Sequence, residues 1–497
     1  MNHDEYAARD ALGLAECVRK GEVTPAELLA LAQARCAAVN PRINAVTIPM
    51  PEQAQAHLKA GFDGPFAGVP FLIKDIGQEY QGVATTLGSR AMRGHVAHEH
   101  AEVTRRFIAA GVNIFGKTST PELALKGITE PERFGPCRNP WDLSRTPGGS
   151  SGGAAAAVAA GIVPMAGASD GGGSIRIPAA CCGLFGLRPS RGRVPAGPSQ
   201  GEVWEGASSE HVLTRSVRDS AAMLDAIAGP DVGAPFIIAP PAEPYRDAMQ
   251  RDPGRLRIAY TTRSPIGTPV DPQCVAAVED AAQLLRGLGH EVDEAPPPID
   301  GMQLAKSYLH LYFGQTAAKV RAVRQLTGAS GAEFEAETRV LALIGDSISA
   351  TDYVSWRLRW NDYARALGAH LTRYDLLMTP VWASLPLKVG AAQLPAWQQQ
   401  ALKPLLALGN RIGTGHLLRA SGIVEQLAID SLQHVPFTQL SNLTGTPSMS
   451  VPLHWSREGL PLGTHFIAPF GREDRLLQLA AQLEQVRPWF DRRAPLV

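Results

Sequence analysis

The sequence predicts an α/β protein whose core is a mixed, mostly parallel twisted sheet covered by helices on both faces. Short apolar segments of strand character alternate with amphipathic helical segments along all 497 residues, and this alternation is typical of sheets enclosed by helices. The chain shows no repeat, low-complexity segment or linker. We therefore expect one domain over residues 1–497, with a variable, irregularly helical portion at about 301–432.

Periodicity and capping signals locate the individual elements. Thr24-Pro25-Ala26-Glu27 fits a capping box with proline at the first helical position. Helices are expected at residues 4–20, 24–39, 51–60, 101–110, 216–228, 272–288 and 473–483. Strands are expected at residues 44–48, 68–75, 112–115, 256–260, 291–295, 376–380, 448–453 and 464–467. Residues 154–168 predict one tightly packed helix and turn.

Composition excludes several classes of function. Lys plus Arg and Asp plus Glu both number 47, without a basic block, which argues against nucleic acid as a partner. The six cysteines form no Cys-x-x-Cys pair, which indicates a reducing compartment. The polar, acidic N-terminus lacks a signal peptide, and the longest apolar run is too short for a bilayer. We expect a cytoplasmic protein without membrane contact that acts on a small-molecule substrate, and a homodimer is one assembly open to it.

Three short motifs match known functional patterns but lack the structural context that those patterns require. Gly111 to Thr118 matches the phosphate-loop expression, but its four middle residues predict a strand that leaves no open loop. Residues 148–152 match the nucleophile elbow G-x-S-x-G, although no apolar strand leads into them. His95, His98 and His100 lie in a loop expected at 82–100 without metal-ligand spacing. We therefore expect neither metal nor cofactor.

The strongest signal is the stretch from Thr146 to Pro178. It begins with Thr-Pro-Gly-Gly-Ser-Ser-Gly-Gly and ends with Ser-Asp-Gly-Gly-Gly-Ser-Ile-Arg-Ile-Pro. Glycine lets a ligand approach the main chain closely, and successive backbone N–H groups aimed at one point bind an anion. Beside a nucleophile, such a concavity acts as an oxyanion hole.

Together the two loops resemble the amidase signature family, hydrolases that use a Ser–Ser–Lys triad. The matching positions are Ser150, Ser174 and Lys74, the last in the apolar segment Val69-Pro70-Phe71-Leu72-Ile73-Lys74-Asp75. The resemblance extends to Arg138-Asn139-Pro140-Trp141-Asp142 and to Gly459-Leu460-Pro461-Leu462-Gly463. Within the family, residues 452–456 and 470–474 resemble the nylon-oligomer amidases, although Gly171 and Gly172 make the second loop richer in glycine.

The resemblance implies a role for each residue. Ser174 attacks the amide carbonyl, and Ser150, which carries a cis peptide bond in this family, relays protons to and from neutral Lys74. Backbone N–H groups of Gly171, Gly172, Gly173 and Ser174 form the oxyanion hole, while Ser151, Asp170 and Arg176 support the two loops. Burial lowers the pKa of a lysine because it desolvates the charged form, which makes a neutral lysine base reasonable.

The variable portion supplies the candidates for the substrate pocket. Tyr308, Tyr312 and Phe313 are the first choice, followed by Trp356 and Trp360, whose spacing puts them on one helix face. They suggest an aryl amide or oligo-amide substrate, with carbamate and ester side activity. Three alternatives stay open: the amidase subunit of a glutamine-dependent tRNA amidotransferase, an α/β-hydrolase-type esterase with Ser150 as nucleophile, and a non-catalytic binding protein.

Overall fold

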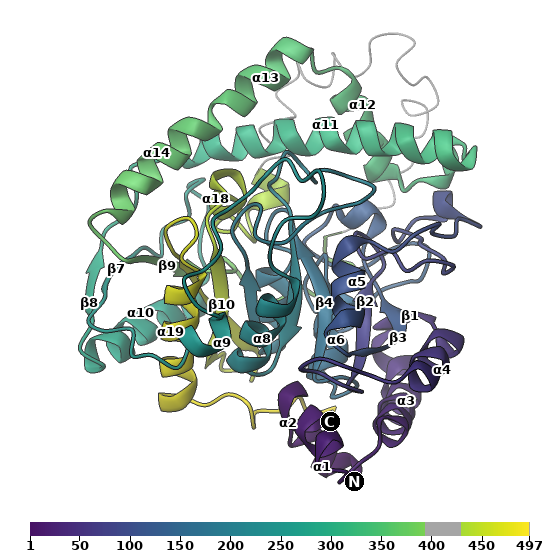
Figure 1. Cartoon of the computed structure of the whole chain (residues 1–497). Helices are drawn as coiled ribbons and strands as arrows, with labels where there is room; N and C mark the ends of the chain where they lie inside the picture. The colour runs from purple at the N-terminus through teal and green to yellow at the C-terminus, as the bar shows by residue number, and fades with distance from the viewer. Residues whose placement is uncertain (393–428, 497) are drawn as a thin grey trace.

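The computed structural model describes residues 1–392 and 429–496, and one large sheet runs through this part of the chain (Figure 1). Its eleven strands have the order β1-β3-β2-β4-β6-β5-β10-β11-β9-β7-β8. They are β1 Val46–Pro49, β2 Pro70–Lys74, β3 Asn113–Thr118, β4 Met165–Asp170, β5 Phe185–Arg188, β6 Ser209–Thr214, β7 Arg257–Tyr260, β8 Glu291–Glu294, β9 Leu376–Pro380, β10 Ser448–Trp455 and β11 Pro461–Ile467. The predicted mixed α/β fold is confirmed.

The expectation of a mostly parallel sheet is wrong. Six of the ten strand pairings between described residues are antiparallel and four are parallel. The parallel pairings are confined to β3-β2-β4 and to β9-β7-β8. Between these groups, β10 and β11 are joined by a short turn, which only antiparallel strands allow. In the pair β4–β6, Ser169 lies directly opposite Glu210.

Two groups of helices pack against the sheet. One consists of α6 with α3 and α7, and the other of α8 with α5, α9 and α19. The helices before residue 300 are α1 His3–Ala7, α2 Ala11–Arg19, α3 Pro25–Ile43, α4 Pro51–Ala60, α5 Glu102–Ala109, α6 Gly152–Ala159, α7 Arg176–Cys182, α8 Val217–Ile227, α9 Tyr245–Ala248 and α10 Pro272–Gly287. The later ones are α11 Gly301–Thr327, α12 Ala336–Asp346, α13 Ala350–Leu358, α14 Trp360–Leu371, α18 Gln439–Thr444 and α19 Glu473–Val486.

Two local predictions need correction, and one is confirmed. The helix expected at 4–20 is interrupted, because the Asp10 side chain accepts a hydrogen bond from Gly13 N and caps a new helix there. The run 154–168 continues into strand β4, which the sequence did not reveal. Thr24 and Glu27 form the predicted capping box at the start of α3.

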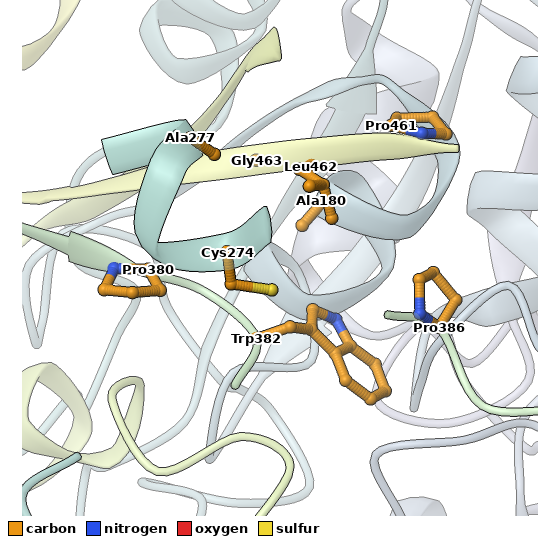
Figure 2. Close-up of a pocket in the computed structure, with 9 residues that line it drawn as sticks. All are labelled: Ala180, Cys274, Ala277, Pro380, Trp382, Pro386, Pro461, Leu462 and Gly463. Carbon is orange, nitrogen blue, oxygen red and sulfur yellow. The ribbon is translucent and has the colours of Figure 1, made fainter. Parts of the chain in front are cut away.

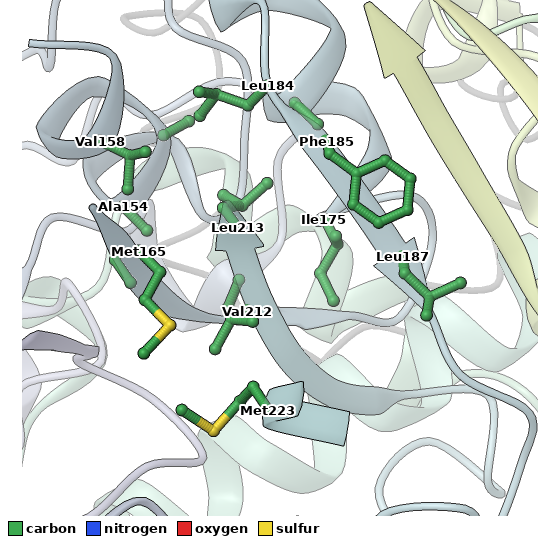
Figure 3. Close-up of a cluster of buried hydrophobic side chains, with 14 of the residues drawn as sticks. Ala154, Val158, Met165, Ile175, Leu184, Phe185, Leu187, Val212, Leu213 and Met223 are labelled. Carbon is green, nitrogen blue, oxygen red and sulfur yellow. The ribbon is translucent and has the colours of Figure 1, made fainter. Parts of the chain in front are cut away.

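The central core explains the small residues around α6. Side chains from α6, β4, β5, β6 and α8 meet in one buried cluster, whose labelled members include Val158, Met165, Phe185, Leu213 and Met223 (Figure 3). Six of the eight residues of α6 are buried glycine or alanine packed against neighbouring strands and α7. Small side chains let the backbone of α6 approach the sheet closely, and this fixes the serine loop that precedes it.

A helical layer lies across one end of the sheet (Figure 1). Helix α11 packs against α12, α13 and α18, and α14 also contacts α18. This layer is the described part of the variable portion expected at 301–432, of which residues 393–428 lie outside the description. Among the helices of the described residues, none combines the length and apolar character needed to cross a membrane.

Candidate active site

Lys74 ends strand β2 and is fully buried. Its Nζ donates hydrogen bonds to Ser150 Oγ at 2.8 Å and to Ser169 Oγ at 2.9 Å. Burial lowers the pKa of Lys74 to about 8, although the nearby carboxyls of Glu210 and Asp170 act in the opposite direction. An amine in this environment is neutral in a substantial fraction of molecules near pH 8 and can accept a proton.

The serine loop before α6 is tied to the end of β4. The peptide bond between Gly149 and Ser150 is cis, as the resemblance implies. Ser151 Oγ donates to Ser169 O at 3.2 Å and accepts from Ser169 N at 3.3 Å. Ser151 N also donates to Ser174 O at 3.4 Å, which joins the two serine loops directly. Ser151 therefore has the supporting contacts expected of it.

A buried ion pair holds the second loop. Arg176 Nη2 donates to Asp170 Oδ1 at 2.8 Å and Nε donates to Oδ2 at 2.9 Å, and both side chains are fully buried. Asn442 Nδ2 adds a third side-chain bond to Asp170 Oδ1 at 2.9 Å. The positive charge of Arg176 and these hydrogen bonds lower the pKa of Asp170 far below its usual range, despite burial. Bidentate geometry with additional donors is what a buried ion pair requires.

The glycine loop, residues 171–174, lies between Asp170 and Arg176 and presents backbone N–H donors. Gly173 N donates to Asp170 Oδ1 at 2.7 Å and is therefore already engaged. The Gly172 carbonyl accepts from Thr438 Oγ1 at 2.6 Å and from Gln439 Nε2 at 3.2 Å, which fixes the orientation of the loop. The hydrogen bonds among described residues give no acceptor to the N–H groups of Gly171, Gly172 and Ser174. These three groups are the donors available to a ligand.

Aromatic rings from α11 and from the 204 loop adjoin the glycine loop. A Cβ at Gly172 would lie 2.0 Å from the Tyr308 hydroxyl, so only glycine fits beneath this ring. A Cβ at Gly171 would be 3.5 Å from the Trp204 ring. Tyr308 also packs against Trp204 and Tyr312, at centroid distances of 6.3 and 6.2 Å. Of the two extra glycines noted in the sequence, Gly172 thus makes room for an aromatic wall, whereas a side chain at Gly171 would meet it at ordinary contact distance.

The five aromatic candidates have different surroundings. Tyr312 belongs to the same wall, and its hydroxyl donates to Leu125 O at 2.8 Å. Phe313 is buried in the core of the helical layer, and its ring centroid lies 6.0 Å from that of Tyr312. Trp356, on α13, stacks on His310, whereas Trp360 begins α14 and is buried. The structure thus brings Tyr308, and through it Tyr312, closest to the glycine loop.

Sequence reasoning missed several residues that contact the loops. Trp204, Thr438, Gln439 and Asn442 carry no local motif, and three of them lie more than 260 positions from their partners in the loops. Trp204 has a left-handed backbone with φ of 55°, which is rare for a bulky residue. That backbone is not visible in a single sequence.

The three short motifs have ordinary structural roles in the described residues. Asn113–Thr118 is the buried strand β3, and Lys117 Nζ donates to Thr85 Oγ1 at 2.9 Å instead of facing a loop. Bridges and turns, rather than a strand, precede Ser150, and its side-chain partner is Lys74. A nucleophile elbow would also need a histidine downstream of Ser150; those at 211, 310, 434 and 465 bond to other groups, and His416 lies outside the described residues. The described residues contain no cluster of three metal-ligating side chains.

A small cavity elsewhere offers no chemistry. It has a volume of about 10 Å³ and lies between α7, α10 and β11 (Figure 2). Its lining is almost entirely apolar and comprises Ala180, Cys274, Ala277, Pro380, Trp382, Pro386, Pro461, Leu462 and Gly463. A space of this size holds about one water molecule and is too small for a substrate.

Comparison with known proteins adds independent findings. The family model described as Amidase matches residues 27–409. A 6-aminohexanoate-cyclic-dimer hydrolase of Pseudomonas sp. (strain NK87) is 37% identical over 98% of this chain and 97% of its own length. The solved structure of a 6-aminohexanoate cyclic dimer hydrolase superposes with a TM-score of 0.90, 36% identity and 99% coverage of both chains. A bacterial aryl acylamidase superposes with a TM-score of 0.82 at 26% identity, covering 97% of this chain and 98% of its own.

Proposed function

The chain belongs to the amidase family and is an amide hydrolase, and from that premise we propose that it cleaves the C–N bond through an acyl-enzyme on Ser174. The observation that carries the proposal is the buried contact between Lys74 Nζ and Ser150 Oγ at 2.8 Å. Lys74 bonds to two serine hydroxyls, and among the described residues no carboxylate forms an ion pair with it. Burying an ammonium without an ion pair lowers the stability of the folded protein, so a purely structural role does not explain this lysine. A role as the proton acceptor for Ser150 explains why the amine is buried there.

The reaction begins with transfer of one proton along the two serines. Neutral Lys74 takes the proton of Ser150 Oγ, Ser150 takes the proton of Ser174 Oγ, and Ser174 Oγ forms a bond to the amide carbon. The ammonium of Lys74 then returns its proton through Ser150 to the amide nitrogen as the C–N bond breaks. Water enters, gives its proton to the same relay and releases the acid from Ser174. A base with a pKa of about 8 makes the rate rise with pH through that range.

The glycine loop stabilises the charge that develops on the carbonyl oxygen. The N–H groups of Gly171, Gly172 and Ser174 are the proposed oxyanion donors, and Gly173 instead holds the loop against Asp170. Donors fixed in advance are worth most, because they need no reorganisation when the charge appears. The contacts from Thr438 and Gln439 to the Gly172 carbonyl provide that rigidity.

The aromatic wall suggests the kind of amide. Trp204, Tyr308 and Tyr312 give an apolar surface beside the glycine loop that leads to Ser174, which fits an aryl amide or the methylene chain of an oligo-amide. A solved relative is titled as a complex of 6-aminohexanoate cyclic dimer hydrolase with substrate, at 35% identity and a TM-score of 0.89. We extend the proposal to small apolar amides of this kind, with slower hydrolysis of carbamates and esters.

Covalent labelling tests the assignment of the nucleophile. The protein is treated with a fluorophosphonate, digested, and analysed by peptide mass spectrometry. We expect the label on Ser174, and prior conversion of Lys74 to alanine should prevent labelling. A label on Ser150 would instead support an esterase elbow. Absence of any label, together with absence of turnover on an amide, carbamate and ester panel, would overturn the proposal.

A further inference from the structure

A glutamine and a glutamate lie behind Lys74 and take no part in the proposed proton relay. Gln78 Oε1 accepts a hydrogen bond from Lys74 N at 2.8 Å, and Gln78 Nε2 donates to Glu210 Oε2 at 2.8 Å. Gln78 Nε2 also lies 3.3 Å from Ala168 O on β4. The amide side chain therefore connects the strand that carries the lysine to the carboxyl of Glu210.

Strand pairing directs this carboxyl toward the amine. Ser169 and Glu210 are opposite each other in the antiparallel pair β4–β6, so their side chains share one face of the sheet with Cβ atoms about 5 Å apart. Ser169 Oγ is itself one of the two hydroxyls that accept from Lys74 Nζ. Glu210 is therefore one side chain removed from the catalytic amine.

Two glycines make room for the pair. A Cβ at Gly167 would come within 2.1 Å of Gln78 Oε1, and a Cβ at Gly77 would come within 2.8 Å of Glu210 Oε1. Gly77 also has a left-handed φ of 75°, which side chains rarely adopt. Any larger residue at either position would displace the amide or the carboxyl from its place.

The other charged groups near the amine are already paired. Asp170 is held by Arg176, and Lys117 Nζ lies 3.6 Å from Asp75 Oδ1. His211, next to Glu210 on β6, bonds to Ser220 Oγ at 2.8 Å, and α6 contributes no titratable side chain. Glu79, in the loop after β2, is the other carboxyl that acts on Glu210. The ion pairs among the described residues include none to Glu210.

We propose that Glu210 is a positioning residue for the reaction, and that its carboxyl, held by Gln78, controls how readily Lys74 releases its proton. The inference rests on the proposed role of Lys74 as base. Ionised Glu210 stabilises the ammonium, whereas protonated Glu210 leaves the amine free to be neutral. Burial raises the pKa of Glu210 to about 8, so the carboxyl is ionised in a fraction of the molecules near that pH. The two groups then titrate in the same pH range and influence each other.

The test is the pH dependence of kcat/KM in Glu210→Gln. Removing the ionisable carboxyl should lower the pKa of Lys74 and move the acidic limb to lower pH by less than about one unit, because Glu210 is itself partly protonated below its pKa of about 8. Starting from a Lys74 pKa of about 8, a shift of about half a unit would raise the rate at pH 7 about two- to threefold relative to the plateau. The plateau itself should not rise, because a less basic amine removes a proton less readily.

Two further variants separate charge from shape. Glu210→Asp keeps the charge and should leave the limb closer to that of the wild type than Glu210→Gln does. Gln78→Met removes the hydrogen-bond donor that favours the ionised form of Glu210, so the acidic limb of kcat/KM should again move to lower pH. This variant takes the place of Glu210→Gln if the latter does not fold. The matched control is Glu484→Gln on α19, a half-buried carboxyl whose pKa is also raised by burial, which should leave the profile unchanged.

The outcomes distinguish this inference from the proposed function. If the wild type hydrolyses amides through Ser174 but neither Glu210→Gln nor Gln78→Met moves the acidic limb, Glu210 has only a structural role. The same conclusion holds if Glu210→Gln and Glu210→Asp move the limb equally, because charge is then not responsible. If the wild type neither hydrolyses amides nor labels on Ser174, the proposed function itself is wrong.

Discussion

The glycine–serine floor, residues 146–178, and the helical cover, residues 301–371, meet at the candidate site but are built differently. Every residue of α7, the helix that begins at the end of the floor, is buried, whereas α13, in the cover, buries none of its nine residues. The floor is held by a buried ion pair and by hydrogen bonds that involve the backbone. The cover is held mainly by apolar packing between its helices, to which aromatic contacts and exposed ion pairs are added.

This difference indicates that the floor carries out the reaction and that the cover determines which substrate is bound. Rigid, fully bonded elements can fix donors and a nucleophile within a fraction of an ångström, as covalent catalysis requires. Helices with exposed outer faces can exchange side chains without disturbing that geometry. We therefore expect substitutions in the floor to affect the reaction itself, and substitutions in the cover to affect which amide is preferred.

The largest effect should come from removing the reacting groups of the floor. Ser174→Ala and Lys74→Ala should each reduce kcat by several orders of magnitude, because the members of such a unit act together. Ser355→Ala, on the exposed side of α13 in the cover, is the matched serine control and should retain the wild-type rate. Steady-state kinetics on one amide, with circular dichroism to verify folding, measure this. Full activity in either floor variant would remove the basis of the comparison.

Ion pairs allow the two regions to be compared by stability. Asp170→Asn leaves Arg176 buried without its counter-charge, and should lower the free energy of unfolding by about 3 kcal/mol. In the cover, Asp346→Asn removes the partner of Arg321, whose side chain is 69% exposed, and should change stability by less than about 1 kcal/mol. Urea denaturation of both variants gives the two free energies. Equal losses would show that burial does not distinguish the regions.

The sequence predicted the floor better than the cover for a physical reason. Lys74, Ser150 and Ser174 could be selected because the two glycine–serine loops together resemble the amidase signature, and Lys74 ends an apolar segment at the position that the resemblance requires. The capping box at Thr24 and the buried strand ending at Lys74 were also visible locally. What holds the floor in place was not, since Asn442 reaches Asp170 across 272 positions of the chain.

The prediction of the fold from the sequence failed mainly at strands that lack an apolar pattern. Met165–Asp170 contains alanine, glycine and serine, which have weak strand propensity, so the segment resembled a continuation of α6. Its neighbour Ser209–Thr214 carries glutamate and histidine at buried positions, which hides the apolar pattern of a strand. Both strands exist because tertiary pairing overrides local preference. The same two segments bring Ser169 and Glu210 together, which no local pattern indicated.

The contact between Gly172 and Tyr308 connects the two regions directly. Gly172→Ala would put a methyl group against the Tyr308 hydroxyl, and overpacking of this kind costs about 1–3 kcal/mol, or about ten- to a hundredfold in kcat/KM. Gly171→Ala, where the nearest atom is 3.5 Å away, should lose much less. Adding Tyr308→Ala to Gly172→Ala should recover part of the rate. A double variant as slow as Gly172→Ala would show that the two regions are not coupled here.

The smallest expected effect lies entirely within the cover. Tyr312→Phe removes the hydroxyl that donates to Leu125 O but leaves the ring in the aromatic wall. Losing one such hydrogen bond should cost about 1 kcal/mol, and we expect it to appear as a several-fold higher KM for an aryl amide with little change in kcat. Michaelis–Menten kinetics on an aryl and a short alkyl amide would measure it. A fall in kcat equal for both amides would instead place Tyr312 with the floor, because only groups that act on the reaction itself slow every substrate alike.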